Sequence, residues 1–292
     1  MLDKYYFGKV DRISPEAPVP IVNIQKEESR LGGASNVANN IVSLGGHSLL
    51  CGVIGHDLFG KEIERISRHK NIETFLLKTS SPTITKARII GGKQQIVRVD
   101  YEDKSELNAD NKKLFRDTIS RILPEYDILV ISDYGKGLIS EDLCRYLIKL
   151  AHKYDKKVII DPKGKNWEKY SGADIVTPNV KELSDIVGYT LPNTDRAIEK
   201  AAREAITNNH LTALLVTRSD KGMSLIGPIP PIHIPTHSEE VFDVSGAGDT
   251  VVATLGLCLA AGFEISEAMR TANIAAGIVV KKVVQLRLPS KN

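Results

Sequence analysis

The feature that most constrains the fold is the alternation of short apolar runs with amphipathic helical patterns along the second half of the chain. Buried parallel strands are near-continuous runs of Val, Ile and Leu, and helices between them cover both faces of the sheet. We therefore predict an α/β protein with a mostly parallel central sheet flanked by helices. The predicted strands are 127–132, 157–161, 174–177 and 213–217, and the predicted helices are 140–154, one from about 179, and 195–208.

Polar residues follow each predicted strand. In open parallel sheets, ligands bind beyond the carboxyl ends of the strands, so we expect a site where these residues meet. They are Ser132-Asp133, Asp161-Pro162-Lys163, Thr177-Pro178-Asn179 and Thr217-Arg218-Ser219.

Two segments depart from this alternation of buried strands and helices. Residues 20–26, and 83–88 together with 94–101, alternate apolar and polar side chains, which is typical of strands with one exposed face. Gly91-Gly92 joins the last two as a hairpin. Together these segments predict a small antiparallel sheet that stands off the main domain. An ordinary surface hairpin is the alternative.

Composition and charge exclude several classes of protein. The net charge of +3 comes from scattered Lys and Arg, so no nucleic-acid partner is expected. The uncharged stretch 250–263 is too short to span a bilayer, and the charged first residues show no signal peptide. The three cysteines are far apart and are predicted to be buried free thiols. We expect a soluble cytoplasmic protein with no membrane partner.

The strongest chemical signal is Asp243-Val-Ser-Gly-Ala-Gly-Asp249, which leads into an apolar helix over 251–262. Glycines before a helix let backbone N–H groups converge, and the helix dipole adds positive potential, which together favour a phosphate. An acidic residue in such a turn repels phosphate, but it has a use if Asp249 takes a proton from an attacking hydroxyl. A glycine-rich turn with Asp249 as a plain N-cap is the alternative.

A second glycine motif lies near the amino end. Gly32 and Gly33 precede a helix that carries Asn36, and they allow a backbone to approach a polyhydroxylated ligand closely. Alone this is a weak signal. The two glycine motifs together, in this order, resemble the two signatures of the ribokinase-like (PfkB) sugar kinases. The resemblance extends over essentially the whole chain, 1–292. It implies a single ribokinase-like kinase domain with an antiparallel lid inserted at about 5–30 and 83–101.

The same resemblance assigns ATP and Mg²⁺ to a set of residues. Gly246, Ala247 and Gly248 would form the anion hole beside the base Asp249. The segment Asn179-Val180-Lys181-Glu182 resembles the family's Asn-x-x-Glu motif, in which Glu182 organises Mg²⁺ and the ATP phosphates. A capping box between Asn179 and Glu182 is compatible with that role. Residues 217–222 resemble the family's nucleotide loop, which implies ATP contacts from Thr217, Ser219 and Gly222, and Asn273 lies where the family contacts adenine.

Four further segments, 2–8, 11–20, 132–137 and 161–164, resemble the D-glycero-β-D-manno-heptose 7-phosphate kinases within this family. That resemblance implies phosphorylation of the anomeric hydroxyl to the 1,7-bisphosphate, a step toward ADP-heptose and the lipopolysaccharide core. It also implies a homodimer through the lid. Asp3 and Asn36 would hold sugar hydroxyls, with Gly32 and Gly33 against the ring. The candidate cations for the 7-phosphate are Arg98, Lys136 and Lys163, and a solvated surface charge is the alternative for each.

The chain departs from the family pattern at both ends. Relatives have an apolar strand before the counterpart of Leu2-Asp3, and residues 285–292 have no counterpart that we identify. Loss of a central strand exposes backbone pairing groups, so the sequence predicts poor solubility or weak activity. Three hypotheses stay open: a heptose 7-phosphate kinase, a kinase for another sugar or sugar phosphate, and a catalytically weak sugar-binding relative. Dependence on a monovalent cation beside Asp243 is also open.

Overall fold

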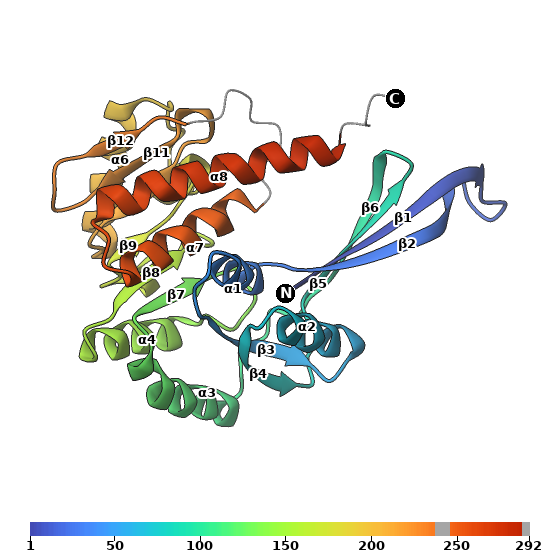
Figure 1. Cartoon of the computed structure of the whole chain (residues 1–292), viewed down its shortest axis with the longest axis horizontal. Coiled ribbons are helices and arrows are strands. Elements are labelled where there is room, and N and C mark those ends of the chain that lie inside the picture. Colours follow the sequence, from blue (N-terminus) through green and yellow to red (C-terminus); the bar gives the residue numbers. More distant parts are fainter. Residues whose placement is uncertain (237–245, 288–292) are drawn as a thin grey trace. The chain divides into compact units, whose positions relative to one another are not determined.

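The computed structural model describes residues 1–236 and 246–287, with side chains up to residue 279. The chain divides into two compact units, each of which is described by itself (Figure 1). The first comprises Met1–Val42 and His47–Ser105, and the second comprises Ser43–Gly46 and the chain from Glu106 onward. The organisation as a single kinase domain stays a prediction.

The first unit contains a four-stranded sheet in the order β2-β1-β5-β6 (Figure 1). The predicted hairpin is confirmed as β5 and β6, which turn at Gly92 with a φ of +62°. The predicted strand at 20–26 is part of β2, which pairs in antiparallel fashion with β1, a strand that was not predicted. The central pairing of β1 with β5 is parallel. A parallel pair needs a long crossover, and the segment between these strands provides one. The strands are β1 (Leu2–Ile13), β2 (Pro20–Leu31), β5 (Thr85–Gly91) and β6 (Gln94–Tyr101).

The crossover packs against the base of this sheet. It consists of α1 (Ala34–Ser43), β3 (Leu49–Gly55), α2 (Leu58–His69) and β4 (Glu73–Thr79), and β3 pairs with β4 in parallel. Leu2 and Leu31, which pair at one end of β1 and β2, are buried in a core with Ile54 and Ile63. The sheet is therefore anchored at one end by apolar contacts.

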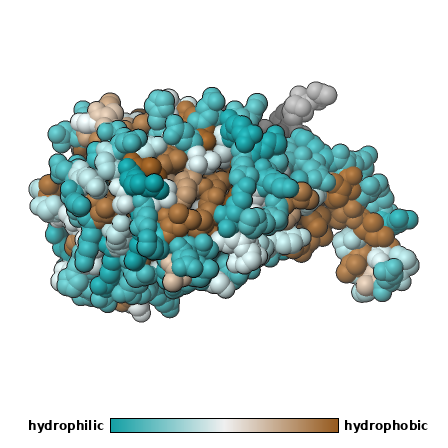
Figure 2. Space-filling model, turned by 90° about the horizontal axis from the view of Figure 1, so that it is seen from below, coloured by the Kyte–Doolittle hydropathy of each residue, from teal (hydrophilic) through white to brown (hydrophobic). Residues whose placement is uncertain are grey.

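Away from this core, the sheet exposes apolar side chains, and Figure 2 shows apolar patches on this part of the first unit. An apolar surface of this kind on a soluble protein commonly marks a contact with another molecule. The exposed residues on or between its strands are Val10, Ile13, Val19, Ile24, Ile96, Val97, Val99 and Tyr101.

The second unit contains a six-stranded sheet in the order β12-β11-β10-β9-β8-β7. The four strands predicted from the sequence are β7 to β10, they pair in parallel, and they confirm the α/β prediction. Strands β11 and β12 extend the sheet in antiparallel fashion. The strands are β7 (Ile128–Ser132), β8 (Lys157–Asp161), β9 (Ile175–Val176), β10 (Leu214–Thr217), β11 (Met223–Ile226) and β12 (Ile232–Ile234).

Helices surround this sheet, and the three predicted ones are confirmed as α4, α5 and α6 (Figure 1). Helix α7 packs on β7 and β8. The two layers approach closely at Gly256, where an added Cβ would lie 3.3 Å from a methyl carbon of Val130. The helical segments are α3 (Ala109–Ile122), η1 (Leu123–Glu125), α4 (Glu141–Lys153), η2 (Glu168–Tyr170), α5 (Val180–Val187), α6 (Asp195–Asn209), η3 (Ser219–Lys221), α7 (Ala247–Ala260) and α8 (Ile265–Arg287).

Two predictions about bulk properties can be compared with these elements. Within the described residues, none of the helices combines the length and the apolar character needed to cross a bilayer. Cys144 and Cys258 are buried free thiols as predicted, whereas Cys51 is only partly buried.

Candidate active site

The carboxyl ends of β7, β8, β9 and β10 meet the start of α7 around a cavity of about 540 Å³ in the second unit. This is the position expected for a ligand in a parallel α/β sheet, and the volume suits a nucleotide-sized molecule. Every residue predicted from the sequence to hold ATP or to act in catalysis lines it: Asn179, Val180, Lys181, Glu182, Thr217, Ser219, Gly222, Gly246, Ala247, Gly248, Asp249 and Asn273.

The start of α7 combines glycine backbone with an acidic side chain. Gly246 is the N-cap, with a φ of +82° and no side-chain cap, so the first N–H groups of the helix are free of a capping side chain. An added Cβ on Gly248 would meet nothing within 4 Å, so the backbone there stays open to a ligand. Such a helix start attracts phosphate through its N–H groups and its dipole.

Asp249 lies in the first turn of α7 rather than at its N-cap, so the N-cap alternative for this residue is wrong. Its side chain is mostly buried, and its carboxylate accepts a hydrogen bond of 2.9 Å from the hydroxyl of Tyr134. A carboxylate held beside an anion-binding helix start can take a proton from a hydroxyl that attacks a bound phosphate. The first part of the predicted motif, 243–245, lies outside the described residues, and the open question of a cation beside Asp243 lies there too.

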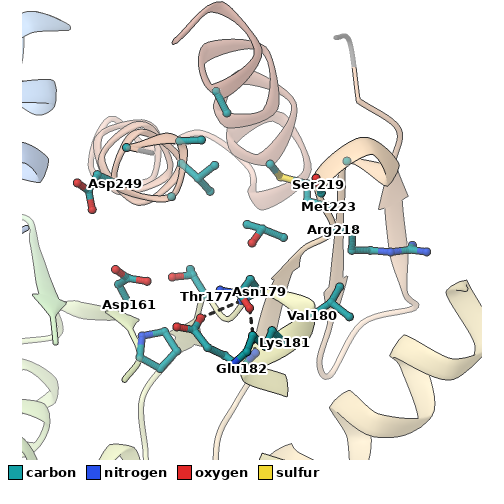
Figure 3. Close-up of a pocket in the computed structure, with 18 of the residues that line it drawn as sticks. Asp161, Thr177, Asn179, Val180, Lys181, Glu182, Arg218, Ser219, Met223 and Asp249 are labelled. Atoms are coloured by element: carbon teal, nitrogen blue, oxygen red, sulfur yellow. Dashed lines mark hydrogen bonds between the residues drawn. The ribbon is translucent and has the colours of Figure 1, made fainter. Parts of the chain in front are cut away.

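A second carboxyl group, Asp161 at the end of β8, lines the same cavity and lies below Asp249 in Figure 3. Burial, followed by the negative charges of Asp249 and Glu182, raises the pKa of Asp161 from its usual value to about 8. Asp161 therefore holds a proton at neutral pH. A protonated carboxyl group cannot take the proton of a hydroxyl, so Asp249 is the better candidate base of the two.

This raised pKa predicts a dependence of stability on pH. Between about pH 4 and pH 8 the unfolded chain loses the proton of Asp161 while the folded chain keeps it, so the wild type loses stability as pH rises. We expect the free energy of unfolding of Asp161→Asn, relative to wild type, to increase between pH 5 and pH 8. The expected increase is on the order of 2–4 kcal/mol, since one pKa unit corresponds to about 1.4 kcal/mol.

Urea unfolding of both proteins at pH 5 to 9 measures this difference. Asp185→Asn, which changes a carboxylate outside the cavity, is the matched control and should change much less with pH. A constant difference between Asp161→Asn and wild type would contradict a proton held on Asp161.

The start of α5 forms another wall of the cavity (Figure 3). The Asn179 side chain accepts from the N–H of Glu182 at 2.9 Å, and the Glu182 carboxylate accepts from the N–H of Asn179 at 3.2 Å. The predicted capping box is therefore confirmed. The other oxygen of Glu182 pairs with the Lys163 ammonium at 3.0 Å. The ordered carboxylate suits Mg²⁺ bound through water. The neighbouring ammonium suits the phosphates of a nucleotide.

The loop after β10 carries Thr217, Ser219 and Gly222. Thr217 bridges to Asn179 in parallel, which joins this loop to the start of α5. The neighbouring Arg218 is buried and pairs with Asp195 at 2.5 Å, and its guanidinium also donates to Asn193. Arg218 thus holds the loop in place, and Figure 3 shows its side chain pointing away from the cavity.

Helix α8 closes the cavity on a further side. The buried Asn273 donates from its amide to the carbonyl of Pro235 at 2.7 Å, which links α8 to the chain after β12. Gly277, one turn along the helix, also lines the cavity, and an added Cβ there would meet nothing within 4 Å. A side chain at Gly277 would therefore have room to extend into the cavity.

The first unit brings together the residues predicted to bind sugar hydroxyls. An added Cβ on Gly32 would lie 2.1 Å from a carboxylate oxygen of Asp3, so only glycine lets Asp3 take this position. Gly33 has a φ of +58° and accepts from the N–H of Asn36 at 2.8 Å. Asp3 also pairs with Arg88 at 2.6 Å, a partner that the sequence did not indicate.

The three cations predicted for a sugar phosphate belong to different units of the chain. Arg98 is on β6 of the first unit, where its half-exposed side chain pairs with Asp100 at 2.9 Å. Lys163 lines the cavity of the second unit, and Lys136 lies partly buried in the loop after β7. Both Arg98 and Lys163 pair with a carboxylate, and their roles toward a sugar phosphate stay predictions.

Comparison with known proteins identifies the family. The model of the pfkB family carbohydrate kinases matches residues 5–286. The chain belongs to this family. Over 284 residues, the pfkB chain is 45% identical to the D-beta-D-heptose 7-phosphate kinase of Bordetella bronchiseptica. The aligned region covers 97% of this chain and 89% of that protein. It is also 45% identical to the bifunctional protein HldE of Haemophilus influenzae, and it spans 59% of that protein's length.

Solved structures confirm the ribokinase-like fold. Phosphofructokinase-2 from Escherichia coli, in its tetrameric inhibited form, matches with a TM-score of 0.80 at 22% identity, covering 96% of this chain and 91% of that one. Arabidopsis thaliana ribokinase complexed with ribose and ATP matches with a TM-score of 0.74 at 21% identity, over 96% and 89% of the two chains. At these identities, the similarity establishes the fold.

The cavity residues of this pfkB chain that were not assigned a role from the sequence include Tyr134, Asp161 and Gly277. Asp161 was among the polar residues expected at the sheet edge, but its raised pKa depends first on its burial in the folded chain and then on Asp249, which is far away in the sequence. Tyr134 lies in the 132–137 segment that resembles heptose kinases. The position of Tyr134 in that segment was the only sequence feature that could have indicated a role for it.

Proposed function

We propose that this chain transfers the γ-phosphoryl group of ATP to the anomeric hydroxyl of D-glycero-β-D-manno-heptose 7-phosphate, giving the 1,7-bisphosphate and ADP. The observation that carries phosphoryl transfer is the mostly buried Asp249 in the first turn of α7, beside an uncapped glycine helix start. The name of the Bordetella relative, which the chain matches over 89% of its length, supports heptose 7-phosphate as the acceptor. The proposed reaction uses two small metabolites, ATP and a sugar phosphate, and would take place in the cytoplasm.

The residues divide the work as follows. When bound, Mg²⁺ and ATP supply an electrophilic phosphoryl group with a partly neutralised charge. The Asp249 carboxylate takes the proton of the attacking hydroxyl, so that the oxygen forms its bond to phosphorus as the bond to ADP breaks. The N–H groups at Gly246, Ala247 and Gly248 stabilise the charge on the transferred group. Lys163, beside Glu182, provides a cation on the phosphate side of the cavity.

We assign recognition of the acceptor to Asp3, Gly32, Gly33 and Asn36, as the resemblance implied. Asp3 and Asn36 offer hydrogen bonds to hydroxyls, and the glycines leave room for a sugar ring. Arg98, Lys136 and Lys163 remain candidates for the 7-phosphate. The kinase domain would be 1–292, with 5–30 and 83–101 as its lid segments.

The test is an ATP-consumption assay with a panel of heptose 7-phosphates, hexose phosphates and free sugars. Turnover highest with the D-manno-heptose 7-phosphate supports the proposal. Faster turnover with another sugar phosphate, such as a fructose phosphate, would favour the second hypothesis. Sugar binding without ATP consumption would favour a catalytically weak relative. Exchange of K⁺ for Na⁺ or choline in the same assay tests the monovalent cation.

The magnesium role gives a specific prediction. Glu182→Gln replaces a negative oxygen ligand by a neutral one, so the Mg²⁺ concentration for half-maximal activity should rise by roughly tenfold. A magnesium titration of activity at saturating ATP measures this. Glu168→Gln, an exposed carboxylate outside the cavity, is the control. If the titration of Glu182→Gln matches wild type, Glu182 acts only in the capping box.

We further propose a homodimer in which the apolar side chains of the β2-β1-β5-β6 sheet pack against a second copy. The support is the number of exposed apolar residues on and between its strands, including Ile13 and Val97. Analytical ultracentrifugation of wild type and of a variant with Ile13→Ser and Val97→Ser tests this. A monomeric wild type would exclude it.

A further inference from the structure

The hydroxyl of Tyr134 contacts the candidate base directly. Tyr134 lies in the loop between β7 and α4, and its hydroxyl donates to Oδ1 of Asp249 at 2.9 Å. The two residues are 115 positions apart in the sequence. Both are partly or mostly buried and both line the cavity. The contact therefore joins the sheet edge to the start of α7.

The loop that carries Tyr134 is itself held from beneath by a buried carboxylate. Asp133 accepts from the hydroxyl of Tyr170 at 2.7 Å and from the N–H of Gly135 at 2.7 Å. It also pairs with the ammonium of Lys169. Its side chain is only 2% exposed, so these bonds are made away from water, where they fix geometry most firmly. The backbone on both sides of Tyr134 is thus fixed before any ligand binds.

Asp249 shares the cavity with the carboxyl groups of Asp133, Asp161 and Glu182. The charge of Asp249 is close enough to Asp161 to contribute to the raised pKa of Asp161. The dipole of α7 favours negative charge at the start of this helix, where Asp249 lies. A neutral donor bonded to one carboxylate oxygen favours the ionised form and leaves the side chain in one orientation. A general base requires both properties.

We infer that Tyr134 is a positioning residue, whose phenol holds the Asp249 carboxylate ionised and aimed for proton transfer. This inference rests on the proposed function, in which Asp249 is the base. It adds to that function a residue that acts through its bond to Asp249.

The test uses Tyr134→Phe in the full chain and reads Asp249 directly. Carbon-13 NMR of protein labelled at the aspartate carboxyl carbons follows the titration of Asp249 without any substrate, and the signal lost in Asp249→Asn assigns it. We expect the titration midpoint of Asp249 to rise by roughly one pH unit in Tyr134→Phe, the loss of one bond to the ionised form. In kinetics, kcat should fall by about tenfold with its acidic limb moved to higher pH, while KM for ATP changes less than twofold.

Tyr189→Phe is the matched control, because Tyr189 also donates to a carboxylate, Glu204 at 3.0 Å, but lies outside the cavity. It should leave the Asp249 midpoint and kcat unchanged. An equal midpoint in wild type and Tyr134→Phe overturns the inference, even if turnover falls. A raised midpoint in a chain that phosphorylates no sugar of the panel keeps the role of Tyr134 and rejects the proposed kinase function.

Discussion

Asp249→Asn is expected to lower kcat for phosphoryl transfer by roughly 10²–10⁴-fold, the usual effect of losing a general base. Asparagine keeps the shape of the side chain and can still accept from Tyr134, so the start of α7 should be unchanged. An amide cannot take the proton of the attacking hydroxyl. Affinity for ATP should change little, because the N–H groups at the helix start remain.

Steady-state kinetics with heptose 7-phosphate and calorimetric titration with an ATP analogue measure the two quantities separately. Asp117→Asn, an exposed carboxylate paired with Lys113, is the matched control and should leave both unchanged. Turnover of Asp249→Asn within a few-fold of wild type would remove Asp249 from the mechanism.

Lys169→Met is expected to lower the free energy of unfolding by about 3–5 kcal/mol, which is typical when one partner of a buried ion pair is removed. The Lys169 side chain is 13% exposed and its partner Asp133 is 2% exposed. Removing the ammonium leaves a buried carboxylate that accepts from two neutral donors, the Tyr170 hydroxyl and the Gly135 N–H. Neither compensates a full charge.

Urea unfolding measures this loss. Lys181→Met is the control, since its ion pair with Asp185 involves a side chain that is 84% exposed, and the cost should stay below about 1 kcal/mol. The double variant with Asp133→Asn should recover part of the stability, because it removes the uncompensated charge. A loss below about 1 kcal/mol in Lys169→Met would contradict the importance of this pair.

Those parts of the fold that depend on local pattern were predictable from the sequence. The four parallel strands of the second unit were placed to within a residue or two, because each is a short apolar run bounded by polar residues. The parallel pairing of β1 with β5 was not predicted. It depends on which strand meets which after a long crossover, and neither strand carries a local mark of that choice.

In the candidate site, too, local motifs were predictable and contacts between distant residues were not. The glycine turn, Asp249 and the capping box of Asn179 and Glu182 were found because each lies within one short motif. The proton on Asp161 and the bond from Tyr134 to Asp249 were not found, since each depends on side chains brought together from distant parts of the chain. The roles of the sugar-side residues stay predictions.

Because α7 packs closely on the sheet at Gly256, the distance between this helix and the sheet affects where Asp249 lies. Asp249 is carried two turns before the point where α7 approaches Val130 of β7, so the volume of a core side chain affects how far Asp249 lies from the loop of Tyr134. Any gain in bulk at residue 256 must be offset by a smaller neighbour on the strand. Selection on turnover would therefore act on an apolar contact that no substrate ever reaches.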